Sequence, residues 1–86
     1  MNQTLTDLPN IGPTIAKRLR SVGIQTPADL AGAGPVEIWK RLVERYPGQT
    51  IPVCYYLYSL EGAIRGVHWD DLPAEVKQRL EREARM

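Results

Sequence analysis

The chain is organised around one stretch, LPNIGPTIAKRL at Leu8–Leu19. Pro9 fixes its own φ, while Asn10 and Gly12 tolerate positive φ, so the first half of the stretch is typical of a tight hairpin turn. Pro13 suits the first turn of a helix. Main-chain N–H groups that gather at such a helix start bind anions, which makes phosphate binding the first hypothesis. The alternative hypothesis is a turn that only sets the angle between two packed helices.

Length and composition predict one small domain over residues 1–86, because 86 residues leave room for one modest core. The net charge is only +1, so affinity for nucleic acid would need locally clustered charge. Cys54 is the only cysteine and His68 the only histidine of the sequence, which excludes a disulfide within the chain and a Cys/His zinc site. We find no apolar run of membrane-spanning length and no signal peptide at the start. We therefore expect a cytoplasmic, soluble protein without cofactor, metal or membrane partner.

Two helices are predicted around the hairpin. The first covers about 4–8, with Thr4 as N-cap and Asp7 three residues later. The second covers about 13–22, and Gly23 follows where a left-handed residue ends a helix. Its apolar residues recur at helical spacing, at Ile15, Ala16, Leu19 and Val22.

Two more helices are predicted before residue 47. Thr26 is the expected N-cap of a short helix, with Pro27 in its first position and Asp29 facing its positive end. Glycines at 32–34 are expected to break it. A longer helix follows over about 35–46. Its predicted apolar stripe is Val36, Trp39, Leu42, Val43 and Tyr46.

The segment 51–67 is ambiguous by local rules. Residues 53–58 have the composition of a strand, but the length of the segment favours a helix. We predict a largely buried central helix, within which Glu61 and Arg65 form an i,i+4 pair. Trp69 is expected to pack, and a last helix opens near 70–73 and runs to about 85. The predicted class is all-α, a compact bundle of about five helices.

Two motifs carry a resemblance to known proteins. The first, LPNIG at 8–12 followed by a helix, resembles a helix-hairpin-helix module, here over about 4–30. The second is LYSLEGAIRGVHW at 57–69, within the remaining helices at about 35–85. In this order they resemble the C-terminal domain of the DNA-transformation (competence) regulator TfoX, over about 5–80. The resemblance implies an all-helical bacterial domain, which occurs both fused to a separate N-terminal domain and free-standing, as we expect here.

Helix-hairpin-helix modules generally bind the DNA backbone without sequence specificity, through hairpin amides and nearby basic side chains. Asn10 replaces the first hairpin glycine, Pro13 has no N–H, and Thr14 stands where a basic residue is often found. Lys17 and Arg18 lie about 100° apart around a helix, so only one of them can face a given phosphate. The resemblance implies a nucleic-acid-binding set of Asn10, Ile11, Gly12, Thr14, Ile15, Lys17 and Arg18.

An enzyme is not expected, because the sequence has no nucleophile with a matching general base. Two hypotheses for function remain. One is weak, sequence-independent binding of DNA phosphates through the hairpin. The other is a protein-interaction or self-association domain in which the hairpin is purely structural. Aromatic residues are enriched at such interfaces, and Tyr55 and Tyr58 are the candidates for that surface.

Overall fold

The computed structural model describes residues 4–85, apart from the side chain of Cys54. This part of the chain folds into five α-helices and two single 3-10 turns, without a strand, which confirms the predicted all-α class. The elements in order are η1 (Leu5–Asp7), α1 (Pro13–Ser21), α2 (Pro27–Ala33), α3 (Pro35–Arg45), α4 (Val53–Arg65), η2 (Trp69–Asp71) and α5 (Ala74–Ala84).

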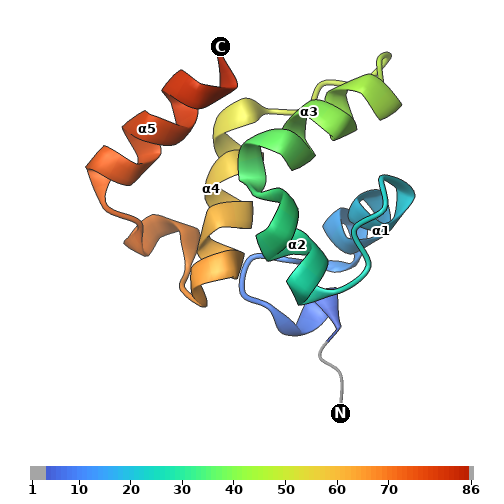
Figure 1. Ribbon diagram of the computed structural model, residues 1–86, viewed down its shortest axis with the longest axis horizontal. Coiled ribbons are helices and arrows are strands. Elements are labelled where there is room, and N and C mark those ends of the chain that lie inside the picture. Colours follow the sequence, from blue (N-terminus) through green and yellow to red (C-terminus); the bar gives the residue numbers. More distant parts are fainter. Residues whose placement is uncertain (1–3, 86) are drawn as a thin grey trace.

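The helix α4 occupies the centre of the molecule (Figure 1). It contacts α2 and α3 on one side, and η2 and α5 on the other. The helix α1 packs on η1 and α3, at the opposite end of the view from α5. The hairpin between η1 and α1 therefore lies where the start of the chain meets the C-terminal end of α4.

Burial explains why 53–65 is a helix in spite of its strand-like composition. Tyr56, Leu57, Leu60 and Ala63 are all at most 4% exposed, and even Ser59 is 2% exposed. A helix satisfies its own main-chain hydrogen bonds, so it can lie in the core without a partner strand. Packing thus overrides the β-propensity of the aromatic run, and the prediction of a largely buried central helix is confirmed.

Local signals set most helix ends. Ile24 N donates to Leu19 O (3.0 Å) and Gly23, at φ +89°, donates to Arg20 O (3.2 Å). This pair of bonds is a Schellman motif, and it closes α1 where the sequence predicts. The same motif closes α4 around Gly66, at φ +77°.

Thr26 is the N-cap of α2, as predicted, and the structure adds a capping box with Asp29. The hydroxyl of Thr26 accepts a bond from Asp29 N (3.1 Å), and the Asp29 carboxylate accepts bonds from Gln25 N (3.1 Å) and Thr26 N (3.2 Å). The bond from the Gln25 main chain, followed by those from Thr26, lowers the pKa of Asp29 below its usual value of 3.8. The N–H groups of Gln25, Thr26 and Asp29 at the start of α2 are therefore already engaged.

Several predicted helix limits are wrong. The first helix is a single 3-10 turn, because it has too few residues to nucleate an α-helix. Gly32 stays helical, and the break comes at Gly34, whose φ of +82° suits a residue without a side chain. The last helix starts only at Ala74, because η2 precedes it and Pro73, the N-cap, is extended at ψ 147°.

The predicted apolar stripe of α3 is partly wrong. Ile38 is fully buried although the stripe omits it, whereas Val43 is 40% exposed. The side chains that face the core are those of Ile38 and Leu42, which lie four residues apart on one side of the helix. Trp69, which was expected to pack, is 37% exposed at the surface of η2.

Candidate nucleic-acid interface

The hairpin is a tight turn that delivers the chain into α1. Ile11 N donates to Leu8 O (3.4 Å) across the turn, and Asn10 adopts a φ of +71°. Proline followed by a residue with positive φ is the arrangement of a type II turn. Asn10 thus adopts the positive φ that the sequence permits, whereas Gly12, the N-cap of α1, has a φ of −90° and does not use its freedom there.

The N-terminus of α1 has no side-chain cap. Pro13 has no N–H, so Thr14 and Ile15 present the first-turn donors. Gly12 and Thr14 are exposed. Ile11 and Ile15 are each 5% exposed and pack in the core, so these two residues can contribute only main-chain groups to a ligand.

The side chain of Asn10 turns inward rather than toward solvent. Its Nδ2 donates to Val67 O (3.0 Å) and Ser59 O (3.3 Å), and its Oδ1 accepts a bond from Trp69 N (3.2 Å). The hairpin is thereby tied to α4 and to the residues that follow it. A Cβ on Gly62 would lie 2.6 Å from Asn10 Nδ2, so this glycine permits the close approach. The two sequence motifs meet at this contact.

Lys17 and Arg18 have different surroundings. Lys17 is exposed and makes no hydrogen bond or ion pair with another described residue. Helical side chains lean toward the N-terminus, which places Lys17 over the first turn of α1. Arg18 instead donates from Nη1 to Tyr56 Oη (2.7 Å) and from Nη2 to Gln49 Oε1 (2.9 Å). Arg18 therefore also anchors α1 to α4 and to the loop after α3.

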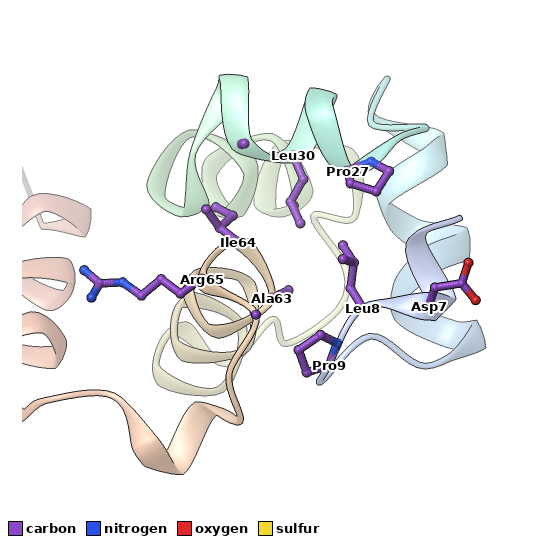
Figure 2. A pocket seen from close by; sticks show the side chains of 10 residues that line it. Asp7, Leu8, Pro9, Pro27, Leu30, Ala63, Ile64 and Arg65 are labelled. Carbon is purple, nitrogen blue, oxygen red and sulfur yellow. The ribbon is translucent and has the colours of Figure 1, made fainter. Parts of the chain in front are cut away.

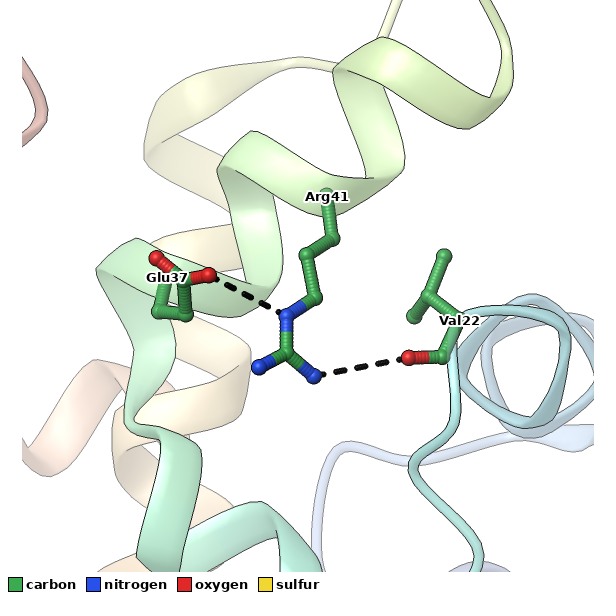
Figure 3. Close-up of polar contacts among 3 residues, drawn as sticks. All are labelled: Val22, Glu37 and Arg41. Carbon is green, nitrogen blue, oxygen red and sulfur yellow. Dashed lines mark hydrogen bonds and ion pairs between the residues drawn. The ribbon is translucent and has the colours of Figure 1, made fainter.

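The charge around α1 is locally one-sided. From residue 8 to residue 28 the sequence has three basic residues, at 17, 18 and 20, and no acidic residue. Arg41 of α3 approaches the end of α1, where its Nη1 lies 3.5 Å from Val22 O, while its Nε pairs with Glu37 at 3.2 Å (Figure 3). A net charge of +1 thus conceals a positive stretch on one helix.

The two tyrosines proposed for an interaction surface are not equivalent. Tyr55 is 53% exposed, and its ring and that of Tyr56 form a T-shaped pair with centroids 5.7 Å apart. Tyr58 donates from its hydroxyl to Glu81 (2.7 Å), and the Lys77 ammonium lies 5.4 Å from its ring. Tyr58 therefore joins α4 to α5, and Tyr55 is the one that faces solvent.

A shallow groove lies between the hairpin and two helices (Figure 2). Its volume is about 370 Å³. The lining is mainly apolar, with Asp7 and Arg65 as its charged members; the other residues are Leu8, Pro9, Pro27, Leu30, Ala31, Ala63, Ile64 and Gly66. It contains no acid–base pair of the kind that catalysis requires.

Residues 4–85 show neither a metal-binding cluster nor a membrane-spanning helix. The described residues hold no group of three or more His, Cys, Asp or Glu side chains that could bind a metal ion. None of the described helices is long and apolar enough to cross a membrane. His68 has a structural contact, because its Nδ1 accepts a bond from Asp70 N (3.2 Å) and caps η2.

Sequence patterns alone missed the contacts of Arg18, Asn10 and Tyr56. One signal existed for Tyr56, since a buried tyrosine hydroxyl needs a hydrogen-bond partner. Nothing in the sequence named that partner as Arg18, which is 38 residues away.

Comparison with known proteins gives the family. The sequence model of one protein family, the TfoX C-terminal domain, matches residues 1–84 of this chain. The chain belongs to the TfoX C-terminal domain family. The DNA transformation protein TfoX1 of Aliivibrio fischeri is 30% identical over 79 residues, which are 92% of this chain but 37% of that protein. This TfoX C-terminal domain therefore spans well under half of that relative.

Solved structures share the fold of this TfoX C-terminal domain. A triclinic crystal structure of an uncharacterized Listeria monocytogenes protein has a TM-score of 0.85 and 32% identity, covering 96% of this chain and 91% of that one. A tetragonal crystal structure of a Listeria monocytogenes protein of unknown function has a TM-score of 0.82 and 33% identity, covering 94% and 95%. The family relation connects the domain to competence regulators.

Proposed function

We propose that this TfoX C-terminal domain is a non-catalytic, cytoplasmic module that binds the phosphate backbone of DNA without reading base sequence. The observation that carries the proposal is the start of α1, which lacks a side-chain cap and lies at exposed Gly12 and Thr14, with exposed Lys17 one turn further along the helix and without a hydrogen bond or ion pair to another described residue. A helix N-terminus favours anions through its free N–H groups and its dipole. The relative in Aliivibrio fischeri carries the name DNA transformation protein, which agrees with a role on DNA.

Each part of the hairpin has a role in this proposal. Gly12, Thr14 and Ile15 offer main-chain N–H groups to one phosphate, and the Thr14 hydroxyl adds a donor. Lys17 supplies the charge over that turn. The side chains of Asn10 and Ile11 hold the turn in shape from within, by hydrogen bonds and by burial. Phosphate contacts position a protein without specifying sequence.

The direct test compares duplex and single-stranded DNA by fluorescence anisotropy at several salt concentrations. Two or three phosphate contacts along α1, which carries basic residues at 17, 18 and 20, predict a slope of log K against log salt of about −2 to −3. Lys17→Gln should reduce the magnitude of the slope by about one, whereas Arg82→Gln on α5 is a matched charge control and should not. Wild-type binding without salt dependence, or equal slopes for the two variants, would contradict the proposal.

A second variant separates binding from folding. Gly12 has an extended φ of −90°, and a Cβ there would meet no atom within 4 Å, so a capping side chain fits. Gly12→Asp should preserve or slightly raise stability, because aspartate is a good N-cap. It should also abolish binding, since the new carboxylate occupies the free N–H groups and repels phosphate. Gly12→Asp binding DNA as well as wild type would exclude the α1 terminus as the site.

Protein interaction or self-association is the second candidate function. The exposure of Tyr55, at 53%, favours it, because aromatic side chains are enriched at interfaces. Light scattering across a concentration series, with Tyr55→Ser as the variant, tests self-association. A wild-type monomer at every concentration would rule out this form of the candidate.

A further inference from the structure

Two arginines share one aromatic ring at the far end of α1. The Arg18 guanidinium carbon lies 5.5 Å from the centre of the Tyr46 ring, and that of Arg45 lies 5.2 Å from it. Arg18 comes from α1, whereas Arg45 is the last residue of α3. Cation–π contact is favourable for each arginine, but it brings two like charges close together.

Neither charge is neutralised. No ion pair joins Arg18 or Arg45 to a carboxylate among the described residues. Arg18 hydrogen-bonds only to neutral acceptors, on Tyr56 and Gln49. Arg45 is exposed and makes no hydrogen bond with another described residue. The positive charge at this place is therefore free to meet an anion.

The site is also held in place before any ligand arrives. The Tyr46 hydroxyl lies 2.9 Å from Ser21 Oγ, which in turn donates to Arg18 O at 2.6 Å. Two hydrogen bonds fix the guanidinium of Arg18 as described above. A cation that is already positioned loses little conformational freedom on binding, so more of the interaction energy remains for the ligand.

The surrounding charges are mixed but leave the site positive. A shallow surface hollow is lined by Val22, Arg41, Glu44 and Arg45. Glu44 is the carboxylate of this hollow, and it forms no ion pair with either arginine there. Arg41 is paired with Glu37, as Figure 3 shows.

We propose that Arg18, Tyr46 and Arg45 form a second phosphate site, which takes another phosphodiester of the DNA whose first phosphate is bound at the start of α1. This inference rests on the proposed function. The axis of α1 rises about 6 Å from Thr14 to Arg18, so the two residues lie about one helical turn apart on the same side of α1. One strand running along α1 would thus reach both sites, with the Tyr46 ring in contact with both guanidinium groups.

The test uses Arg45→Gln, because Arg45 is exposed and its loss leaves the contacts of α1 intact. In the anisotropy titration this variant should lower the magnitude of the salt slope by about one relative to wild type, and Arg82→Gln should leave it unchanged. If Lys17→Gln lowers the slope while Arg45→Gln behaves like Arg82→Gln, the proposed function stands and the second site is wrong. If wild type shows no salt-dependent binding, the proposed function itself fails.

An independent measurement uses inorganic phosphate as the probe. We expect the arginine side-chain Nε–H NMR signals of Arg18 and Arg45 to shift and saturate as phosphate is added. In Arg45→Gln the shift of Arg18 should weaken, and in Arg82→Gln it should be unchanged. Signals of Arg18 and Arg45 that move no more than that of Arg82 would overturn the anion site, whatever the result with DNA.

Discussion

Replacing Asn10 by glycine tests the contact that joins the two sequence motifs. Glycine keeps the positive φ of +71° without strain but removes three hydrogen bonds, to the carbonyls of Ser59 and Val67 and from the N–H of Trp69. A hydrogen bond contributes about 1 kcal/mol net. Because water can reach part of this site, we expect the free energy of unfolding to fall by about 2–3 kcal/mol.

The measurement is urea unfolding followed by circular dichroism, together with a thermal scan. A loss of about 2–3 kcal/mol corresponds to a fall in Tm of roughly 10–20 °C in a domain of this size. Asn10→Ala is the companion variant, because it loses the same bonds and also places a Cβ in the left-handed region. It should be less stable than Asn10→Gly by about 1 kcal/mol.

A double-mutant cycle with Gly62 localises the effect. In the wild type, a Cβ on Gly62 would lie 2.6 Å from Asn10 Nδ2 and 2.7 Å from Val67 O. Asn10→Gly removes one of these two clashes, so Gly62→Ala should cost less in that background. Asn10→Gly within about 0.5 kcal/mol of wild type, or strict additivity with Gly62→Ala, would refute the interpretation of Asn10 as the link between the motifs.

Three further predictions concern stability. Main-chain hydrogen bonds lower the pKa of Asp29, so the stability that its carboxylate contributes is present above pH 3.8 and lost as pH falls through the lowered pKa. The difference in urea midpoint between wild type and Asp29→Asn should therefore shrink below pH 3.8. A difference that stays constant with pH would contradict this. Tyr56→Phe removes the acceptor of Arg18 and should lower the free energy of unfolding by about 0.5–1.5 kcal/mol in urea titrations, whereas no loss would mean that Arg18 finds water instead. Arg65→Ala removes the ion-pair partner of Glu61, which is 8% exposed, and should lower the free energy of unfolding by about 1–2 kcal/mol. Arg79→Ala breaks an exposed pair and should lower it by less than about 0.5 kcal/mol. Equal losses in urea unfolding would show that burial of the pair is unimportant.

Sequence reasoning succeeded where a structural signal is local. The Thr26 N-cap and the left-handed Gly23 involve residues within about five positions, so each can be recognised from a short window. The α3 stripe failed for the opposite reason. Val43 and Ile38 both fit an apolar face, and only the position of α4 determines that Ile38 faces inward.

The candidate site was predicted in outline and decided in detail by tertiary contacts. The turn, the start of α1 and the basic residues at 17 and 18 are evident in the sequence. The packing of α1 separates those two cations, because the guanidinium of Arg18 is bound by Tyr56 and Gln49 while Lys17 has no such partner. A residue one position away on a helix points about 100° elsewhere, so neighbours in sequence have different environments.

By itself, the sequence determined the all-α class, most helix ends and the turn before α1, since prolines, glycines and capping side chains act over one helical turn. Only the tertiary structure decided what Asn10 does. Its carboxamide forms hydrogen bonds with Ser59, Val67 and Trp69, which lie 49, 57 and 59 positions further along the chain. These bonds hold the hairpin against α4. Side-chain partners at that separation are chosen by the packing of whole helices, because the direction and reach of a side chain matter only once both main chains are in place.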